Sequence, residues 1–250
     1  KLGWRIMAEI TSFLDILPDP NNPIGTAGQA GGTDGPGFKS IKFSSSAPIQ
    51  VSRSNSGRLI TRGIAGHKWS INITYNPMTR DNFEPIYSFL LQRKGRLNPF
   101  YVQLPNQYTS RSSAFNTHLG SNTIYVKTAH NAGVEVMLQD GHHASTYATQ
   151  PQPGDMFTIT DSEDSLHTKA YRVTRVTNYD DYLTGSRPGQ SNGERYVYFA
   201  PNLQRAVSDN STVVYTNPKI RVILNKDVQE YSLGTNNLYT FSLSLDEAQA

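Results

Sequence analysis

The clearest pattern in the chain is an alternation of apolar and polar residues from His67 to Asn76. Apolar side chains occupy every second position of this segment, and polar side chains lie between them. An antiparallel strand with one buried face has this period of two. A second long alternation ends the chain at residues 227–245, and shorter ones begin at Phe38 and Ile49. The apolar positions of the two long segments are Trp69, Ile71, Ile73 and Tyr75, and Tyr239, Phe241, Leu243 and Leu245.

One segment has helical spacing instead. Between residues 81 and 94, apolar side chains recur three and four positions apart, which is the stripe of an amphipathic helix. Asp81 and Glu84 have the spacing of an N-terminal capping box, and Pro85 is tolerated only near the first turn. Gly95 is suited to the left-handed position that follows a helix. The sequence therefore predicts one α-helix at about residues 81–94.

The second half of the chain consists of short alternating segments separated by Gly, Pro and Asp turns. These segments recur between residues 123 and 215, and turn sequences such as Pro153-Gly154-Asp155 lie between them. Many short strands with this punctuation are typical of a small barrel or sandwich. Residues 106–218 are therefore expected to form a β-domain of their own.

These patterns together predict a mainly β protein with one helix and one inserted domain. Residues 38–105 and 219–250 share long amphipathic strands, so they are expected to form one antiparallel β-sandwich that carries the helix. The stretch 106–218 would then be a small β-barrel inserted into it. Residues 1–37 contain a Pro-rich break followed by a Gly-rich run with few apolar side chains. We expect them to form a flexible N-terminal arm, or an arm that orders against a neighbouring subunit.

Composition excludes several classes of function. The chain has 250 residues and no cysteine, which removes thiol catalysis, iron–sulfur clusters and zinc sites of the cysteine type. Charged residues make up 17% of the chain and the net charge is +3, so the surface is polar but weakly charged. No apolar run approaches the roughly 18 residues of a membrane helix, and membrane insertion is not expected.

Catalytic and metal-binding motifs do not emerge from the sequence. His142 and His143 are adjacent and could share a metal ion only on an irregular loop, so a surface loop is the simpler interpretation. Two acidic groups, residues 161–164 and 180–181, lie in polar, turn-like stretches where solvated loops, calcium binding and acid–base chemistry all remain open. We therefore expect no enzyme activity, no catalytic or metal-binding residues and no cofactor.

The densest basic group is formed by Arg93, Lys94 and Arg96. One interpretation is that these residues cap the helix and form a solvated turn, since cations are favourable at the last turn of a helix. The alternative is a subunit contact or a surface that lines a channel and meets an acidic partner or passing DNA. We select these three residues as the candidate assembly site.

The order of several motifs resembles one protein family. Gly66-His67-Lys68-Trp69 is followed by Tyr75-Asn76-Pro77-Met78-Thr79-Arg80, by the helical segment, and by Arg93-Lys94-Gly95-Arg96-Leu97-Asn98-Pro99-Phe100. Further matches are Gly154-Asp155-Met156-Phe157, Tyr198-Phe199-Ala200-Pro201 and the ending Tyr239-Thr240-Phe241-Ser242-Leu243. This order, over about residues 40–246, is similar to that of the minor tail and distal tail proteins of tailed bacteriophages and of phage-derived gene transfer agents.

The resemblance implies a structural protein of the virion with a fold like that of tail-tube proteins. Such proteins form a hexameric ring at the tail tip or baseplate, between the tail tube and the hub, and the ring encloses a channel through which DNA passes. The implied partners are further copies of the chain, the tube protein and the hub or baseplate proteins, assembled in the host cytoplasm. The alternatives are another baseplate, hub or tube component, and a carbohydrate- or receptor-binding module built on the Tyr-rich residues 106–218.

Overall fold

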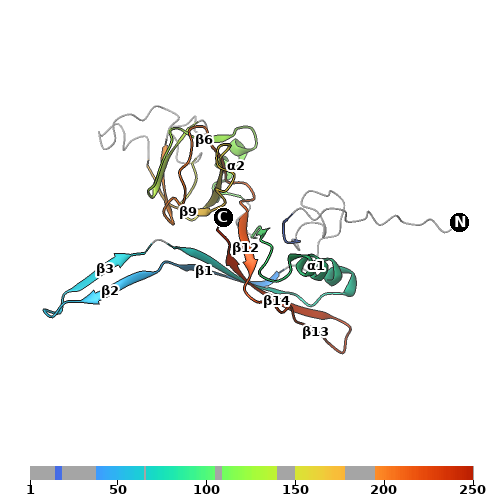
Figure 1. Ribbon diagram of the computed structural model, residues 1–250. Helices are drawn as coiled ribbons and strands as arrows, with labels where there is room; N and C mark the ends of the chain where they lie inside the picture. The colour runs from blue at the N-terminus through green and yellow to red at the C-terminus, as the bar shows by residue number, and fades with distance from the viewer. Residues whose placement is uncertain are drawn as a thin grey trace. The chain divides into compact units, whose positions relative to one another are not determined.

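The computed structural model describes residues 15–18, 38–64, 66–104, 109–139, 150–177 and 195–249 (Figure 1). The chain divides into two compact units. The first comprises residues 1–102 and 221–248, and the second comprises residues 103–220 together with the last two residues. Strands outnumber helices among the described residues, so the protein is mainly β, as the sequence predicts.

The first unit is built on a six-stranded sheet. Five strands follow the order β1-β4-β14-β12-β5, and β13 pairs with the first half of β14. The pairings of β4 with β1 and with β14 are antiparallel, and they place Ile41, Ile73 and Leu243 in one row. The strands are β1 (Phe38–Ser46), β4 (Lys68–Tyr75), β5 (Phe100–Val102), β12 (Ile220–Leu224), β13 (Tyr231–Leu233) and β14 (Tyr239–Glu247).

Helix α1 (Arg80–Arg93) packs against one face of this sheet and confirms the predicted helix. The helix begins after Thr79 without a side-chain cap, so the predicted capping box of Asp81 and Glu84 is wrong. Phe83 stacks on Tyr239 of β14 with the ring centroids 4.5 Å apart, and Phe89 meets Phe100 of β5 edge-on at 5.4 Å. The apolar alternation of β4 and β14 faces the helix, and all eight of its apolar positions except the half-buried Tyr239 are buried. The opposite face of β4 and β14 carries serine, threonine and asparagine side chains together with Lys68 and Asp246.

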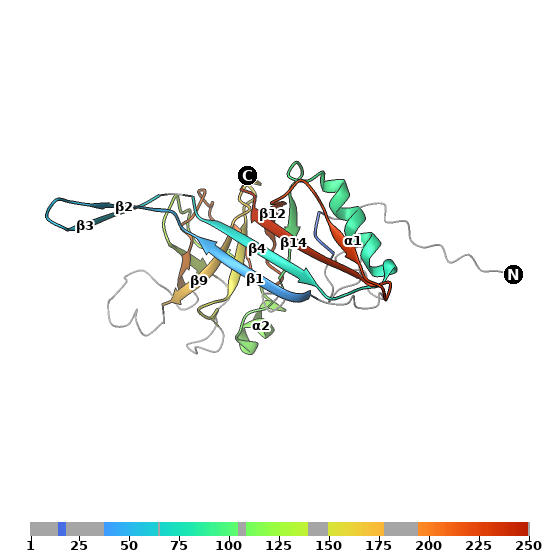
Figure 2. The same cartoon turned by 90° about the horizontal axis from the view of Figure 1, so that it is seen from below.

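A two-stranded arm continues from β1 and β4. It consists of β2 (Ile49–Arg53) and β3 (Leu59–Gly63), and every residue of both strands is exposed. Figure 2 shows β2 and β3 extending beyond the ends of β1 and β4. The turn between them is closed by the Gly57 N–H, which donates to the Ser54 carbonyl at 2.8 Å. We call residues 49–64 the hairpin arm.

The second unit is a closed six-stranded barrel with the order β10-β7-β6-β11-β8-β9, which confirms the predicted small β-barrel. Its core is rich in aromatic rings, with Phe157 in contact with Tyr171, Phe199 and Tyr215. The strands are β6 (Ile124–Val126), β7 (Glu135–Gln139), β8 (Met156–Thr160), β9 (Ala170–Val176), β10 (Arg195–Ala200) and β11 (Thr212–Val214).

A second helix, α2 (Ser113–Leu119), corrects the expectation of a single helix. The Ser112 hydroxyl caps its start by accepting a hydrogen bond from the Phe115 N–H at 3.3 Å. Phe115 is the one residue of α2 that is fully buried, in the barrel core. Only Phe115 and Leu119 of this seven-residue helix pack against the core, and one such pair is too short a pattern for helical spacing to reveal.

Candidate assembly interface

The hairpin arm exposes apolar side chains on both of its faces. Ile49, Val51 and Leu59 share one face, because Ile49 pairs with Gly63, Val51 with Thr61 and Arg53 with Leu59. Ile60 lies on the other face, and the side chains of Ile49, Val51, Leu59, Ile60 and Ile64 are each more than half exposed. An isolated two-stranded hairpin is at best marginally stable in water. Contiguous exposed apolar surface of this kind marks a site of protein contact.

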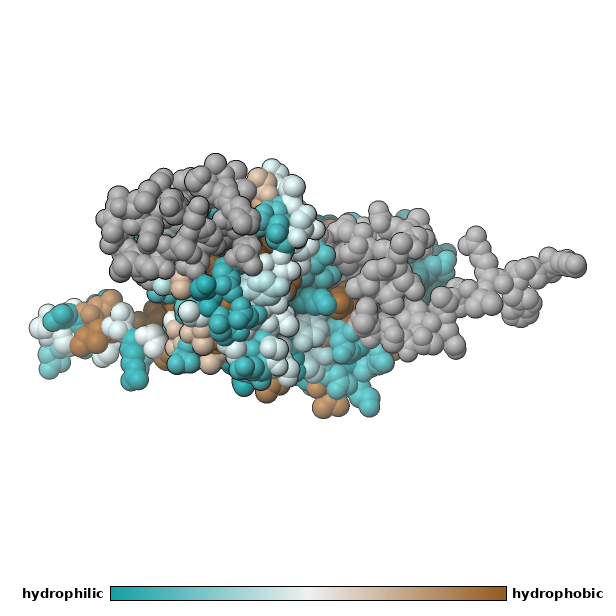
Figure 3. Space-filling view, turned by 90° about the horizontal axis from the view of Figure 1, so that it is seen from above, coloured by the Kyte–Doolittle hydropathy of each residue, from teal (hydrophilic) through white to brown (hydrophobic). Residues whose placement is uncertain are grey.

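The charged residues of the hairpin arm are all basic. Arg53, Arg58 and Arg62 lie on it, and no aspartate or glutamate occurs anywhere in residues 38–80. Figure 3 shows hydrophobic and hydrophilic residues interleaved along the arm, which lies at the left of that view. The arm therefore presents an apolar surface with cations beside it.

The opposite end of the first unit has an apolar surface with acidic residues beside it, which complements the basic hairpin arm. Val228, Tyr231 and Leu233 are exposed there, and Asp227 and Glu230 lie among them. The start of α1 adds the acidic residues Asp81 and Glu84 and the basic Arg80, whose Nε lies 3.3 Å from the Glu84 Oε1. The two acidic residues flank Phe83, whose ring centroid lies 4.9 Å from that of Tyr231. We call residues 227–233 together with the first turn of α1 the β13 end.

Strand register shows that the hairpin arm and the β13 end lie at opposite ends of the sheet. The arm leads into the start of β4 at Lys68. β13 pairs with the start of β14, and this part of β14 lies beside the end of β4, where Ser242 pairs with Thr74. One subunit therefore carries a basic apolar surface at one end of β4 and an acidic apolar surface at the other.

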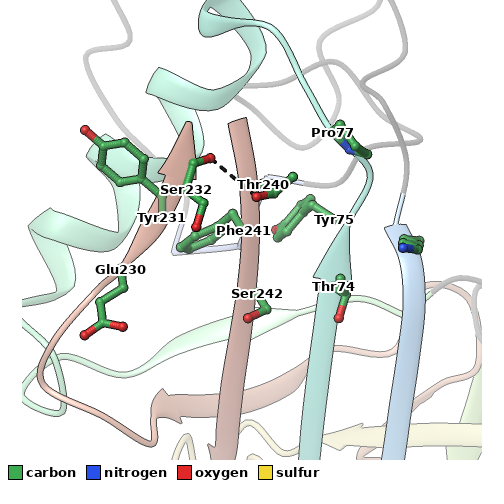
Figure 4. Close-up of a pocket in the computed structure, with 10 residues that line it drawn as sticks. Thr74, Tyr75, Pro77, Glu230, Tyr231, Ser232, Thr240, Phe241 and Ser242 are labelled. Carbon is green, nitrogen blue, oxygen red and sulfur yellow. Dashed lines mark hydrogen bonds between the residues drawn. The ribbon is translucent and has the colours of Figure 1, made fainter. Parts of the chain in front are cut away.

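A groove of about 540 Å³ lies at the β13 end between β13, β14 and β4. Figure 4 shows Tyr75 between β14 and β4 and Phe241 on the side of β14 that faces β13, and their ring centroids are 5.8 Å apart. Lys39 and Glu230 also line the groove and supply one charge of each sign. The groove offers aromatic surface and hydroxyl groups to an occupant, and neither its shape nor its charges could be anticipated from the sequence.

The three basic residues selected from the sequence do not form one patch. Arg93 is 6% exposed, and its Nη1 donates to the Asp15 Oδ1 at 2.6 Å. Its guanidinium also lies over the ring of Phe89, 4.5 Å from the ring centroid. Arg93 is thus a buried residue that holds the segment at Asp15.

Lys94 and Arg96 are exposed and form the turn after α1. Lys94 takes the left-handed conformation at the helix C-terminus, with φ of 54°. Arg96 donates from its guanidinium to the Asn225 carbonyl, and its Nε lies 3.8 Å from the Asp227 carboxylate. Both residues lie on the surface that adjoins the β13 end. Their role at a subunit contact or channel stays a prediction.

Gly95 provides a test of this turn. Its φ is +63°, and a Cβ at this position would lie 3.0 Å from the Asp227 Cα and 3.0 Å from its Oδ1. Gly95→Ala should lower the free energy of unfolding by about 1–3 kcal/mol, because it adds left-handed strain to a steric clash. Gly57→Ala is the control, since Gly57 has φ of +81° with no atom within 4 Å. Equal losses in urea unfolding would show that the contact with Asp227 is unimportant.

The acidic group of residues 161–164 tethers two loops of the barrel. Asp161 accepts hydrogen bonds from the backbone N–H groups of Ser208 and Glu163, and Asp164 accepts from the Arg205 Nε at 2.5 Å. No cluster of three potential metal ligands occurs among the described residues. Residues 140–143 and 180–181 lie outside the described residues.

The tyrosines of the barrel that the structure describes belong to its core and wall. Tyr171 and Tyr215 are fully buried, and Tyr196 and Tyr198 are half-buried on β10. The Arg175 guanidinium lies 4.8 Å from the centroid of the Tyr198 ring. Tyr179 and Tyr182, which the sequence also singles out, lie outside the described residues.

Two histidines of the barrel make its stability sensitive to pH. Burial lowers the pKa of His167, although Asp161 and Asp164 oppose this effect. Burial also lowers the pKa of His130, whose Nε2 accepts a hydrogen bond from the Met137 N–H at 3.2 Å. In each case the neutral imidazole is favoured in the folded state.

Acidification from pH 7.5 to pH 5 is therefore expected to destabilise the barrel. Below about pH 6.5 the unfolded chain binds protons at these histidines more readily than the folded chain does, so stability falls as pH falls. Hydrogen exchange of residues 203–208 at the two pH values measures the effect, because His130 and Val207 exchange backbone hydrogen bonds at 2.9 and 2.8 Å. His167→Gln should reduce the pH dependence, and an unchanged profile would contradict this assignment.

Comparison with known proteins adds one finding. No family model matches the sequence. The distal tail protein pb9 of Escherichia phage T5 is 26% identical over 210 residues, which cover 79% of this chain and 91% of that protein. Neither helix of the described residues has the length and apolar character needed to span a membrane. The match to pb9 confirms the resemblance to distal tail proteins of tailed phages that the order of the sequence motifs indicates.

Proposed function

We propose that the chain is a structural component of a phage tail and that copies of it form a ring at the tail tip. The observation that carries the proposal is the hairpin arm, whose five large apolar side chains are each more than half exposed in the single chain. Each such side chain contributes about 1.5–3 kcal/mol when it is buried. The arm therefore has a strong tendency to associate with another surface.

The β13 end supplies that surface on a second copy. Its exposed apolar residues match those of the arm, and its carboxylates, which outnumber its cations, complement Arg53, Arg58 and Arg62. Because the two surfaces differ and lie at opposite ends of the sheet, they make a head-to-tail contact. Contacts of this type generate closed rings when the rotation between neighbours closes. The resemblance to distal tail proteins indicates six copies.

The face of the sheet opposite α1 suits the wall of a DNA channel. It presents Ser70, Asn72 and Thr74 from β4 and Ser242 and Ser244 from β14. On β1, β4 and β14 the same face carries the charged residues Lys42, Lys68 and Asp246 among many hydroxyl and amide groups. A well-hydrated face with so few charges should hold passing DNA only weakly. In this proposal the channel wall is the polar sheet face, and the arms and β13 ends join neighbouring subunits.

The match to the distal tail protein pb9 supports a position in the virion tail. We infer that the chain lies in the virion tail between the tube protein and the hub or baseplate proteins. It is assembled in the host cytoplasm, and DNA contacts the ring only while it passes through the channel. Lys94 and Arg96, which adjoin the β13 end, take part in the subunit contact. The function is structural, without catalysis or a cofactor.

Native mass spectrometry of the purified chain, together with electron microscopy of the same sample, tests the proposal. The expected result is a closed ring of six copies with a central channel. A stable monomer at micromolar concentration would contradict it. Labelling intact virions with an antibody against the chain should place it at the tail tip, and label elsewhere on the particle would contradict that position.

A further inference from the structure

The edge of the sheet at β5 is closed by a segment from far away in the sequence. Ile16 forms a parallel bridge with Tyr101 of β5. The Leu17 N–H donates to the Tyr101 carbonyl at 2.8 Å, and the Tyr101 N–H donates to the Asp15 carbonyl at 2.5 Å. Residues 15–18 therefore act as a short added strand, within the N-terminal stretch that the sequence predicts to be either flexible or ordered against a neighbouring subunit.

Side-chain contacts hold this segment in place, in addition to its backbone hydrogen bonds. Leu17 is 3% exposed and belongs to the buried core. Asp15 accepts the 2.6 Å hydrogen bond from Arg93, whose side chain is 8% exposed, whereas the Asp15 side chain is 62% exposed. The Arg93 Nε has no hydrogen-bond partner within the described part of the chain. Without residues 15–18, Arg93 would keep a buried charge and lose its carboxylate partner, which is unfavourable.

Residues 15–18 therefore occupy a specific binding site. The site consists of the β5 edge, the apolar surroundings of Leu17 and the guanidinium of Arg93. It fits an extended strand that has an acidic residue two positions before a leucine. This recognition is strand addition to an open sheet edge, in which the backbone supplies affinity and side-chain pockets supply selectivity.

Chain length allows the segment to come from another copy. Nineteen residues, 19–37, separate Pro18 from the start of β1 at Phe38. β1 lies at the far side of the sheet from β5, four strand spacings away, which is about 19 Å. Nineteen residues can span up to about 65 Å when extended. The connection is therefore about three times longer than the width of the sheet that it must cross.

We propose that in the assembled ring residues 15–18 of each copy occupy the β5 site of an adjacent copy. This inference rests on the proposed ring. Exchange of an identical segment loses no contact, because every site remains filled, and it adds a covalent tether across each subunit boundary. A tethered segment binds as an intramolecular group once neighbours have met, which strengthens the ring without a new surface. The buried Arg93 then lies at a subunit contact through its hydrogen bond with Asp15.

Disulfide trapping tests the exchange, since the chain contains no cysteine. Ile16 and Tyr101 are bridge partners, and paired positions of adjacent strands lie within the distance that a disulfide can span. Ile16→Cys and Tyr101→Cys are placed in separate chains that are co-expressed and oxidised. The expected result is a covalent dimer on a non-reducing gel that contains one copy of each chain and disappears on reduction. Each variant expressed alone is the control and should give no specific dimer.

A single chain that carries both cysteines completes the test. If the segment is exchanged, oxidation of a ring made of this double-cysteine chain produces covalent species up to the size of the full ring. If every chain closes its own disulfide and the co-expressed pair gives no dimer, the exchange is overturned while the ring stands. Native mass spectrometry before oxidation separates the two proposals, because a monomer would overturn the ring and the exchange together.

Discussion

Aspartate at both apolar positions of β2, Ile49→Asp with Val51→Asp, should abolish the ring and leave a folded monomer. Both side chains are more than half exposed in the single chain, so their loss should change its free energy of unfolding by less than about 1 kcal/mol. At a subunit contact the same change removes two apolar contacts worth about 3–6 kcal/mol, which is a hundred-fold or greater loss of affinity. Native mass spectrometry measures the assembly, and circular dichroism measures the fold.

A matched variant separates this effect from that of added negative charge. Gln50→Asp with Ser52→Asp introduces the same two charges on the other face of the same strand, since Gln50 pairs with Arg62 and Ser52 with Ile60. We expect this variant to weaken the ring much less. If the two double variants assemble equally well, or both fail, the apolar face of β2 is not the determinant of assembly.

The largest loss of stability is expected from Phe157→Ala in the barrel. Phe157 is fully buried, and its ring lies 5.3 to 5.6 Å from those of Tyr171, Phe199 and Tyr215. Removing a buried phenyl group from such a cluster costs about 3–5 kcal/mol, because it loses transfer free energy and leaves a cavity. Urea unfolding followed by the circular dichroism of the aromatic side chains should show an earlier transition.

Thr160→Ala is the control for this substitution, because Thr160 lies on the same strand and is exposed. Its effect should stay within about 0.5 kcal/mol. A loss below 1 kcal/mol for Phe157→Ala would show that the aromatic cluster does not hold the barrel together. The chain has two units and can unfold in two steps, so the transition that reports on the barrel is the one to compare.

Regular periodicity explains which elements the sequence could predict. The alternation at residues 67–76 corresponds to β4 (Lys68–Tyr75), and that near the end corresponds to β14 (Tyr239–Glu247). Both strands bury one face, so every second residue lies in the core and the apolar pattern has a period of two. α1 was equally clear because its stripe, its Pro85 and its terminal Gly95 all agree.

The hairpin arm shows why the assembly surface was harder to find. The alternation of Ile49 and Val51 with Gln50 and Ser52 predicts one buried face, yet both faces are exposed in the single chain. A period of two cannot distinguish a face buried within the chain from one buried against another copy. The useful signal was the absence of acidic residues from 38 to 80, which the total charge of +3 concealed.

Long-range pairing limited what could be said about the basic group. Arg93 was chosen as a surface cation, but its carboxylate partner Asp15 lies 78 positions earlier in a segment without periodicity. The turn at Arg96 is likewise held by Asn225 and Asp227, about 130 positions later. Such contacts depend on which strands become neighbours, and the residue types around the helix end do not encode that.

The way the barrel is threaded into the first unit affects how the protein can be changed. The chain leaves the sheet after β5 and returns on β12, and these two strands are hydrogen-bonded neighbours. The exit and the return therefore lie close together, as the termini of many domains do. Such an attachment lets one insert replace another while the sheet keeps its register. The position between β5 and β12 is therefore a suitable insertion site. Recombination between phages could exchange the inserted domain there, and a foreign domain could be displayed there by design.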